Sequence, residues 1–222
     1  MPSRLRPGRP PRRYRRCAWR EAPFAALDFE TTGLDYARDT IVSFGVVPVT
    51  AGRVVVGEAS HQLVAPSVPP SVASQRVHEL RPADLAGAPG LDEARVVLAR
   101  AIAGRYLLVW FAEVELHFLG AIFGGRRGRW SGRCLDVRNL AIEAEGAPAA
   151  ARGQAGFALS STAARYGVPV AEPHQALDDA MVTAQLFLVL AGRLGGRPDL
   201  TAGQLLAAAR PSRLEQRFKR AV

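Results

Sequence analysis

The chain has 222 residues, of which 48% are hydrophobic and 22% are charged, so it is long enough for one domain of ordinary size with a buried core. It has no uninterrupted run of the ~18 or more apolar residues that a membrane span needs, and its two cysteines cannot build a disulfide framework. The amino-terminal arginines stand where a signal peptide would need an apolar stretch. We therefore expect a cytoplasmic protein with no membrane partner.

The net charge of +9 is concentrated at the amino terminus, because the first 20 residues contain eight arginines and no acid. We expect residues 1–22 to form a basic disordered tail, residues 23–195 a single domain, and residues 196–222 a partly helical tail. A basic tail can contact phosphates without sequence specificity. Lys219 is the only lysine, so compositional drift towards arginine explains the tail equally well, as does a start site placed too early.

From residue 23 onward, strands and helices are predicted in a regular order. Apolar and β-branched runs predict strands over residues 24–29, 40–49 and 53–64, with a turn at 50–52 and a loop at 66–70. A helix over 91–103, a strand over 106–111, a helix over 113–123 and a basic loop over 124–132 follow. Helical spacing of apolar residues then predicts helices over 136–145, 159–166 and 175–194. A meander of strands followed by alternating strands and helices indicates an α/β domain around a mixed sheet.

The first predicted strand ends in two closely spaced acids. Asp28 and Glu30 face the same side of the strand, because side chains alternate along it. Two carboxylates at the end of a buried strand are costly unless a positive charge lies between them. A divalent cation, which prefers oxygen ligands, fits this requirement. Taken alone, the pattern also suits a strand end whose acids reach solvent.

A second candidate segment opens the helix predicted over residues 175–194. His174 lies at or just before its start, and Asp179 lies one turn inside it. A helix amino terminus favours a carboxylate or an anionic phosphate, and histidine can exchange a proton near neutral pH, as a general base does. Taken alone, the segment also suits a helix cap with a solvent-exposed histidine.

The two segments together resemble the DnaQ-like (DEDDh) family of 3′–5′ exonucleases, which includes the epsilon proofreading subunit of bacterial DNA polymerase III. The first family motif is matched by Asp28, Glu30, Thr31 and Gly33, and the third by His174 and Asp179. The resemblance extends from about residue 24 to about residue 190. It implies a ribonuclease H-like fold, in which helices flank a mixed five-stranded sheet in a single domain, together with two divalent ions and nucleotidyl hydrolysis.

The middle motif departs from the family pattern. Trp110-Phe111 replaces the usual His-Asn pair, and alignment of the apolar pair Phe118-Leu119 puts Glu115 where the family has an aspartate. Glutamate keeps the oxygen donor and adds a methylene group. Glu113 is the alternative ligand, and a degraded site is the third reading. We favour Glu115, because its register fits without a gap.

The resemblance implies a role for each matched residue. Asp28, Glu30, Glu115 and Asp179 are expected to hold two Mg²⁺ ions, for which Mn²⁺ can substitute, with His174 as the general base. Contacts to the terminal nucleotide are expected from Thr31, Thr32 and an aromatic side chain, Phe29 or Phe111. The remaining histidines, His61, His78 and His117, are not expected to bind metal. Asp136 is expected to have a structural or substrate-side role.

The expected partner is nucleic acid with a single-stranded 3′ end, with DNA favoured over RNA, and a DNA polymerase is a candidate partner. The expected role is the removal of terminal nucleotides in proofreading or repair. Two alternatives stay open. The chain could be a catalytically weak DnaQ-like module that recruits nucleic acid or a polymerase, or an exoribonuclease that trims RNA.

Overall fold

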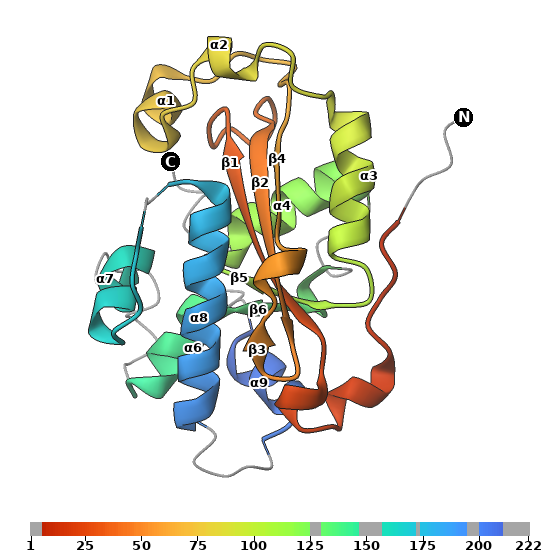
Figure 1. Ribbon diagram of the computed structural model, residues 1–222, viewed down its shortest axis with the longest axis vertical. Coiled ribbons are helices and arrows are strands. Elements are labelled where there is room, and N and C mark those ends of the chain that lie inside the picture. The colour runs from red at the N-terminus through yellow and green to blue at the C-terminus, as the bar shows by residue number, and fades with distance from the viewer. Residues whose placement is uncertain (1–5, 125–129, 147–156, 172–173, 195–199, 211–222) are drawn as a thin grey trace.

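The computed structural model describes residues 6–124, 130–146, 157–171, 174–194 and 200–210 (Figure 1). The strands are β1 (Phe24–Thr31), β2 (Ile41–Thr50), β3 (Arg53–Val54), β4 (Ser60–Leu63), β5 (Tyr106–Val109) and β6 (Cys134–Asp136). The α-helices are α1 (Val72–His78), α2 (Pro82–Leu85), α3 (Leu91–Ala101), α4 (Ala112–Phe123), α6 (Val137–Ala144), α7 (Leu159–Arg165), α8 (Ala176–Leu194) and α9 (Ala202–Ala208). Three short 3-10 helices are η1 (Arg12–Arg15), η2 (Trp19–Glu21) and η3 (Val56–Glu58).

These strands form one mixed six-stranded sheet in the order β3-β2-β1-β5-β6, with β4 also paired to β2. β1 is antiparallel to β2 and parallel to β5, and β5 is parallel to β6. The run at residues 53–64, expected as one strand, is divided by η3 into β3 and β4. Because of this division and of β6, for which the sequence patterns predicted no strand, the sheet has six strands instead of the expected five, and the mixed α/β architecture is confirmed.

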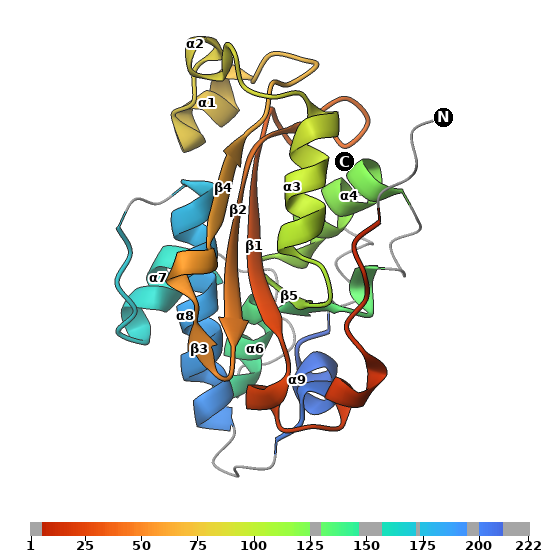
Figure 2. The same cartoon turned by 45° about the vertical axis from the view of Figure 1, so that its right-hand side comes forward.

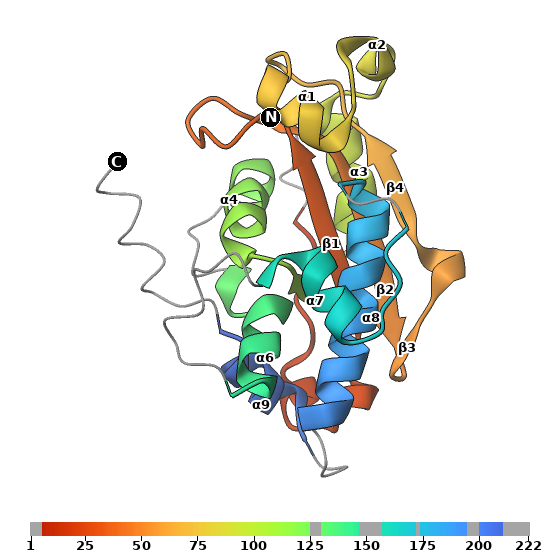
Figure 3. The same ribbon diagram turned by 90° about the vertical axis from the view of Figure 1, so that its left-hand side faces the viewer.

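Helices cover both faces of the sheet (Figures 2 and 3). On one face, Phe24 and Ala26 of β1 pack with side chains of α6 and α8. On the other face, the alternate residues Ala25, Leu27 and Phe29 pack with side chains of α3 and α4. β1 is thus buried on both sides, as a central strand between two helical layers is expected to be. Asp28 and Glu30 continue the alternation on the α8 face.

The predicted helices agree with the structure to within about two residues at each end, which is the usual uncertainty of helix boundaries. Two elements that the sequence did not predict, α1 and α2, lie between β4 and α3. Ser71 begins α1 by accepting a hydrogen bond from the backbone N–H of Ser74. In the expected carboxy-terminal tail, α9 begins at Thr201 with a reciprocal hydrogen-bonded pair to Gln204.

The amino-terminal segment differs from the expected disordered tail. Residues 1–5 lie outside the described residues, but residues 6–22 follow a defined path that includes η1 and η2. Trp19 is 3% exposed and belongs to the hydrophobic core between the sheet and α8. Burial of a tryptophan side chain stabilises a fold by several kcal/mol, roughly 3–5 by the cost of its removal, which is enough to hold a short basic segment in place. Within the described part of the chain, no helix is both long and apolar enough to cross a bilayer.

Candidate active site

β1 places two acids on the face of the sheet that α8 covers. In the antiparallel register, Asp28 lies opposite Gly45 of β2, and Glu30 lies opposite Ser43. The register shifts between Glu30 and Thr31, so the strand bends where its acidic side chains end. The two carboxylates therefore project from the last regular part of β1 towards the start of α8.

Gly45 allows α8 to approach the sheet at this point. A Cβ atom built on Gly45 would overlap the backbone of Ala176 and Leu177, the first two residues of α8. The absence of a side chain is therefore what lets the first turn of the helix rest directly on the backbone of β2. Because Gly45 is the pairing partner of Asp28, this contact sets the distance from α8 to that carboxylate. The sequence patterns did not identify Gly45, since its partner lies far away in the chain.

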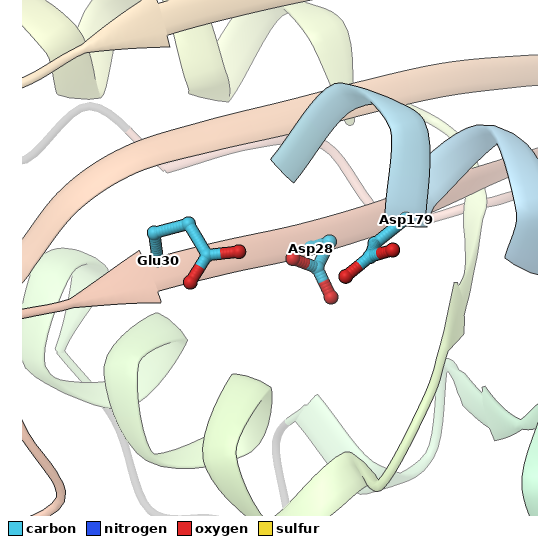
Figure 4. A group of neighbouring side chains, drawn as sticks. All are labelled: Asp28, Glu30 and Asp179. Carbon is cyan, nitrogen blue, oxygen red and sulfur yellow. The ribbon is translucent and has the colours of Figure 1, made fainter. Parts of the chain in front are cut away.

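Asp28, Glu30 and Asp179 form a three-carboxylate cluster. One carboxylate oxygen from each residue lies within 4.8 Å of the other two (Figure 4). Glu30 and Asp179 are each 9% exposed. Oxygen donors this close together, with little access to water, suit a divalent cation such as Mg²⁺.

The electrostatics of the cluster point to the same conclusion. The pKa of Glu30 is raised to about 8, first by burial and then by the neighbouring charge of Asp179. The pKa of Asp28 is raised well above its usual range by burial and by the carboxylates of Glu115 and Glu30. Burial also raises the pKa of Asp179, although the backbone N–H of His174 opposes this shift. Without a cation, the three groups cannot all be charged at neutral pH at low cost.

Glu115 faces this cluster from α4. It is 3% exposed, and its Oε2 atom has no hydrogen-bond partner among the described residues. Burial raises its pKa well above the usual range, and its charge in turn raises the pKa of Asp28. Glu115 is thus the acid of α4 that acts on Asp28, although it is not one of the three residues whose oxygens lie within 4.8 Å of one another. A buried carboxylate oxygen without a donor is expected to need a cation.

His174 lies at the entrance of the cluster, directly before α8. Its backbone has a positive φ of 65°, and its N–H donates a hydrogen bond of 3.1 Å to Oδ2 of Asp179. Its side chain is exposed to solvent. A left-handed backbone is uncommon for residues other than glycine, although histidine, asparagine and aspartate adopt it more often than the rest, and such conformations gather at functional sites. In this conformation the loop before α8 is hydrogen-bonded to the carboxylate of Asp179.

A cavity of about 190 Å³ adjoins the cluster, and Glu30 and His174 line it. Its wall also contains His61 and His78, two of the histidines that the sequence patterns did not select. His78 is 5% exposed, and its Nδ1 atom accepts a hydrogen bond from the backbone N–H of Leu80. Burial lowers the pKa of His61 and of His78. At neutral pH, uncharged imidazoles therefore face Glu30 across a space that can admit a small polar group.

The two threonines expected to contact the nucleotide are occupied within their own turn. Thr31 donates a hydrogen bond of 2.9 Å to the carbonyl oxygen of Gly33. Thr32 is fully buried, donates a 2.7 Å hydrogen bond to Asp39 and accepts one from the backbone N–H of Thr40. The hydroxyl of Thr32 therefore holds the turn after β1 together and is not available to a nucleotide in this conformation.

The aromatic residues differ in their surroundings. Phe111 is half-buried and has a positive φ of 64° at the start of α4. The guanidinium group of Arg138 lies 5.1 Å from the centre of its ring. Phe29 is buried on the opposite face of β1 from Asp28. His117 stacks on Tyr36, with 4.2 Å between the ring centres.

The chain is similar to a protein family, to curated bacterial proteins and to a solved structure. Residues 25–113 match the family model described as Exonuclease. The chain is 32% identical over 191 residues to a DNA polymerase III subunit epsilon-like protein of Rhodobacter capsulatus, covering 84% of this chain and 26% of that relative. It is 26% identical over 168 residues to a DNA polymerase III subunit epsilon of Treponema pallidum, covering 75% of each chain. The chain thus spans only about a quarter of the Rhodobacter relative.

Among solved structures, exonuclease X in complex with 5′ overhanging duplex DNA superimposes with a TM-score of 0.64. The sequence identity is 20%, and the match covers 84% of this chain and 99% of that chain. The likeness shows a shared fold, with helices on both faces of a mixed sheet. The matched segment and the epsilon-like relatives make the chain similar to the DnaQ-like exonucleases, and the superposition shows that it shares the exonuclease fold.

Proposed function

We propose that the protein is a metal-dependent 3′–5′ exonuclease that hydrolyses the terminal phosphodiester bond of single-stranded or frayed DNA. The observation that carries this proposal is the cluster of Asp28, Glu30 and Asp179, whose carboxylate oxygens lie within 4.8 Å of one another. The similarity to DnaQ-like exonucleases supports this class of reaction, and the carboxylate cluster is the site where we propose that it takes place.

The donor set fits two divalent cations. The three clustered carboxylates offer oxygen donors only, and the unpartnered Oε2 atom of Glu115 offers another from α4. Two Mg²⁺ ions held by these four acids, with Mn²⁺ as a substitute, would supply the positive charge that activates a water molecule and stabilises the leaving 3′ oxygen.

The chain's own residues would perform the remaining tasks. His174, exposed at the entrance of the cluster, would accept the proton of the attacking water. The cavity beside Glu30 and His174 would admit a polar group of the terminal nucleotide, and the ring of Phe111 at the start of α4 would stack on its base. Thr31 would contact the nucleotide through its backbone, because its hydroxyl bonds to Gly33.

DNA is the favoured substrate, because exonuclease X was solved with duplex DNA and the relatives are named for DNA polymerase III. The same names support the proposal of a role in proofreading or repair in the cytoplasm, with a DNA polymerase as partner. One observation favours the alternative of a catalytically weak binding module: Glu115 does not lie among the three clustered carboxylates.

A digestion experiment tests the proposal. Labelled single-stranded DNA, duplex DNA and RNA are incubated with the protein in Mg²⁺ or in a chelator, alongside Asp28→Ala and the control Asp178→Ala. Asp178 also lies in the first turn of α8 but is not in the cluster. We expect metal-dependent release of nucleotides from the 3′ end of single-stranded DNA, loss of release in Asp28→Ala, and retention in Asp178→Ala. Binding without release in every condition would favour the weak module, and faster digestion of RNA would favour the exoribonuclease.

A further inference from the structure

The arginine-rich segment before β1 is fixed to the body of the protein. The ring of Trp19 lies edge-on to Phe187 of α8, with 5.4 Å between ring centres. The backbone N–H of Trp19 donates to the carbonyl oxygen of Leu200 at 3.0 Å, and Ala202 donates to Cys17 at 3.2 Å. The segment therefore pairs with the residues that begin α9 instead of moving freely in solvent.

A second set of contacts holds the start of the segment. The carbonyl oxygen of Gly8 accepts hydrogen bonds from the backbone N–H of Gly104 and from the guanidinium group of Arg133. A Cβ atom on Gly203 of α9 would lie 2.5 Å from the carbonyl oxygen of Arg15, so α9 packs closely against η1. The backbone between these contacts is thus defined at both ends.

Within this fixed segment, four arginines form what we call the arginine ridge: Arg12, Arg13, Arg15 and Arg16. All four side chains are exposed. A 3-10 helix has three residues per turn, so residues three apart lie above one another. Arg12 and Arg15 therefore form one column and Arg13 and Arg16 a second. Tyr14, between them, is half-buried against the core. The helix thus turns its aromatic residue inward and its guanidinium groups outward.

The ridge is a concentrated positive charge without local compensation. In the part of the chain that the structure describes, no acid forms an ion pair with any of its four side chains. Four like charges within five residues repel one another unless an anion neutralises them. Arginine presents planar, paired donors that match the geometry of phosphate oxygens. A polyphosphate backbone is the partner that this arrangement suits.

We propose that the arginine ridge binds the phosphate backbone of the nucleic-acid substrate at a second contact, separate from the active site. This inference rests on the proposed function for the nature of the substrate. In Figure 1 the red segment that carries the ridge lies at the lower end of the sheet, whereas the first turn of α8 lies at the upper end. The ridge therefore holds a part of the nucleic acid away from the reacting 3′ end.

The length of β1 gives an estimate of how many nucleotides a substrate needs to reach both the active site and the arginine ridge. The strand runs from Phe24, close after η2, to the carboxylate of Glu30, which is roughly 20 Å at the usual rise per residue. With its bases stacked as in a duplex, a strand advances about 3.4 Å per nucleotide, so roughly six stacked nucleotides reach from one end of β1 to the other. Shorter substrates would occupy the active site without touching the ridge.

A pair of matched variants tests the ridge. In one, all four arginines are changed to Gln (R12Q/R13Q/R15Q/R16Q), and in the other to Lys (R12K/R13K/R15K/R16K), which keeps the charge. Trp19 and Tyr14 stay unchanged, and the melting temperature of each variant is measured to show that the fold is retained. Affinity is measured in a chelator, from the fluorescence anisotropy of labelled DNA strands. One strand has about four nucleotides and the other about twenty, so that they lie below and above the length estimated from the phosphate spacing.

We expect the Gln variant to bind the long strand at least about tenfold more weakly, with binding of the short strand unchanged and the Lys variant close to wild type. The slope of log affinity against log salt should fall by up to about 3 for the long single strand, since each phosphate contact contributes about 0.7. Equal affinity of wild type and Gln variant for the long strand would overturn the proposal, as would equal losses for both lengths. If the wild type digests no substrate but its binding depends on strand length in this way, the exonuclease proposal is contradicted and the proposal that the ridge binds phosphates is supported.

Discussion

The carboxylate of Asp136 accepts a hydrogen bond of 3.0 Å from the backbone N–H of Ala112, the first residue of α4. Its other oxygen accepts from the backbone N–H groups of Arg138 and Asn139, at the start of α6. One buried side chain at the end of β6 thus satisfies donors at the starts of two helices. Because α4 carries Glu115 one turn further on, Asp136 fixes the position from which that acid faces the cluster.

Asp136→Asn should therefore weaken both stability and activity. The amide has one acceptor oxygen instead of two, so at least one buried N–H loses its partner, at a cost of about 1–3 kcal/mol in the free energy of unfolding. Urea denaturation measures this cost, with Asp92→Asn on the exposed first turn of α3 as the control. An Asp136→Asn protein as stable as the wild type would show that the three hydrogen bonds do not hold the helices.

Substitutions in α4 separate the two candidate ligands. Glu115→Gln keeps the shape of the side chain but removes the negative charge that faces Asp28, so nucleotide release should fall nearly as far as in Asp28→Ala. Glu113→Gln should have a mild effect. Glu115→Asp should lower the rate of nucleotide release modestly, because the shorter side chain would not bring its carboxylate as close to the cluster as glutamate does. Steady-state rates and metal titration in the presence of nucleotide measure these effects; a single bound ion, with both glutamates dispensable, would favour the binding module.

Removal of the imidazole at position 174 tests the general base. His174→Ala should lower the rate by about 10² to 10⁴ while metal affinity stays largely unchanged, since the contact of this residue with Asp179 is made by its backbone N–H. The acidic limb of the pH–rate profile should change as well. The same limb in the variant and the wild type would assign the proton transfer to another group.

The metal-free protein should lose stability as the pH rises. The pKa of Glu30 is about 8 in the folded protein, against 4.5 for the unperturbed group. Between these values, the unfolded chain releases a proton that the folded protein keeps, so the free energy of unfolding falls with pH and levels off above about 8. The raised pKa values of Asp28 and Asp179 act in the same direction.

Mg²⁺ should reverse this loss, because it binds the charged carboxylates. Thermal unfolding from acidic to alkaline pH, in chelator and in Mg²⁺, measures both effects, with Glu30→Gln as the variant in which this contribution to the slope is absent. If stability in chelator fell equally steeply with pH in Glu30→Gln and in the wild type, the pH dependence could not be assigned to Glu30.

Gly45→Ala should displace α8 from the sheet. The added methyl group would overlap the backbone of Ala176 and Leu177, and overpacking of this kind costs about 1–3 kcal/mol. Asp179 would move with the helix, and a shift of about 1 Å at a catalytic group can lower the rate by about 100-fold. Gly57→Ala is the matched control, because nothing lies within 4 Å of its added carbon. Normal rates in Gly45→Ala would mean that the sheet absorbs the methyl group without moving the helix.

The sequence indicated the mixed α/β fold and the two segments that supply the clustered carboxylates. Hydrophobic periodicity locates β1 and α8, and local spacing places Asp28 and Glu30 on one face of the strand. The pairing of Gly45 with the start of α8 was not predictable, because a close backbone contact leaves no local pattern. Helix α1 and its cap at Ser71 were not predicted for another reason. Val72 and Val77 of this helix are exposed, so its apolar residues do not form the buried stripe that marks a helix in a sequence.

The amino-terminal segment shows where composition misleads. Its arginines and prolines are typical of disordered chains, and they outweigh a single tryptophan in any average over the segment. Trp19 nevertheless packs against Phe187 and the start of α9. One large apolar side chain can order a polar segment when the rest of the fold provides a pocket for it. Here the residues that form this pocket lie far from Trp19 in the sequence.

The bridge between Ala18 and Thr201 also determines when the amino-terminal segment can dock during folding. Contacts between segments far apart in sequence form slowly, since the chain between them must first be ordered. During synthesis, Trp19 leaves the ribosome well before its partners in α8 and in the residues that precede α9. The basic segment therefore stays undocked until α8 and the start of α9 have been synthesised, and its docking would be a late step in the folding of this domain.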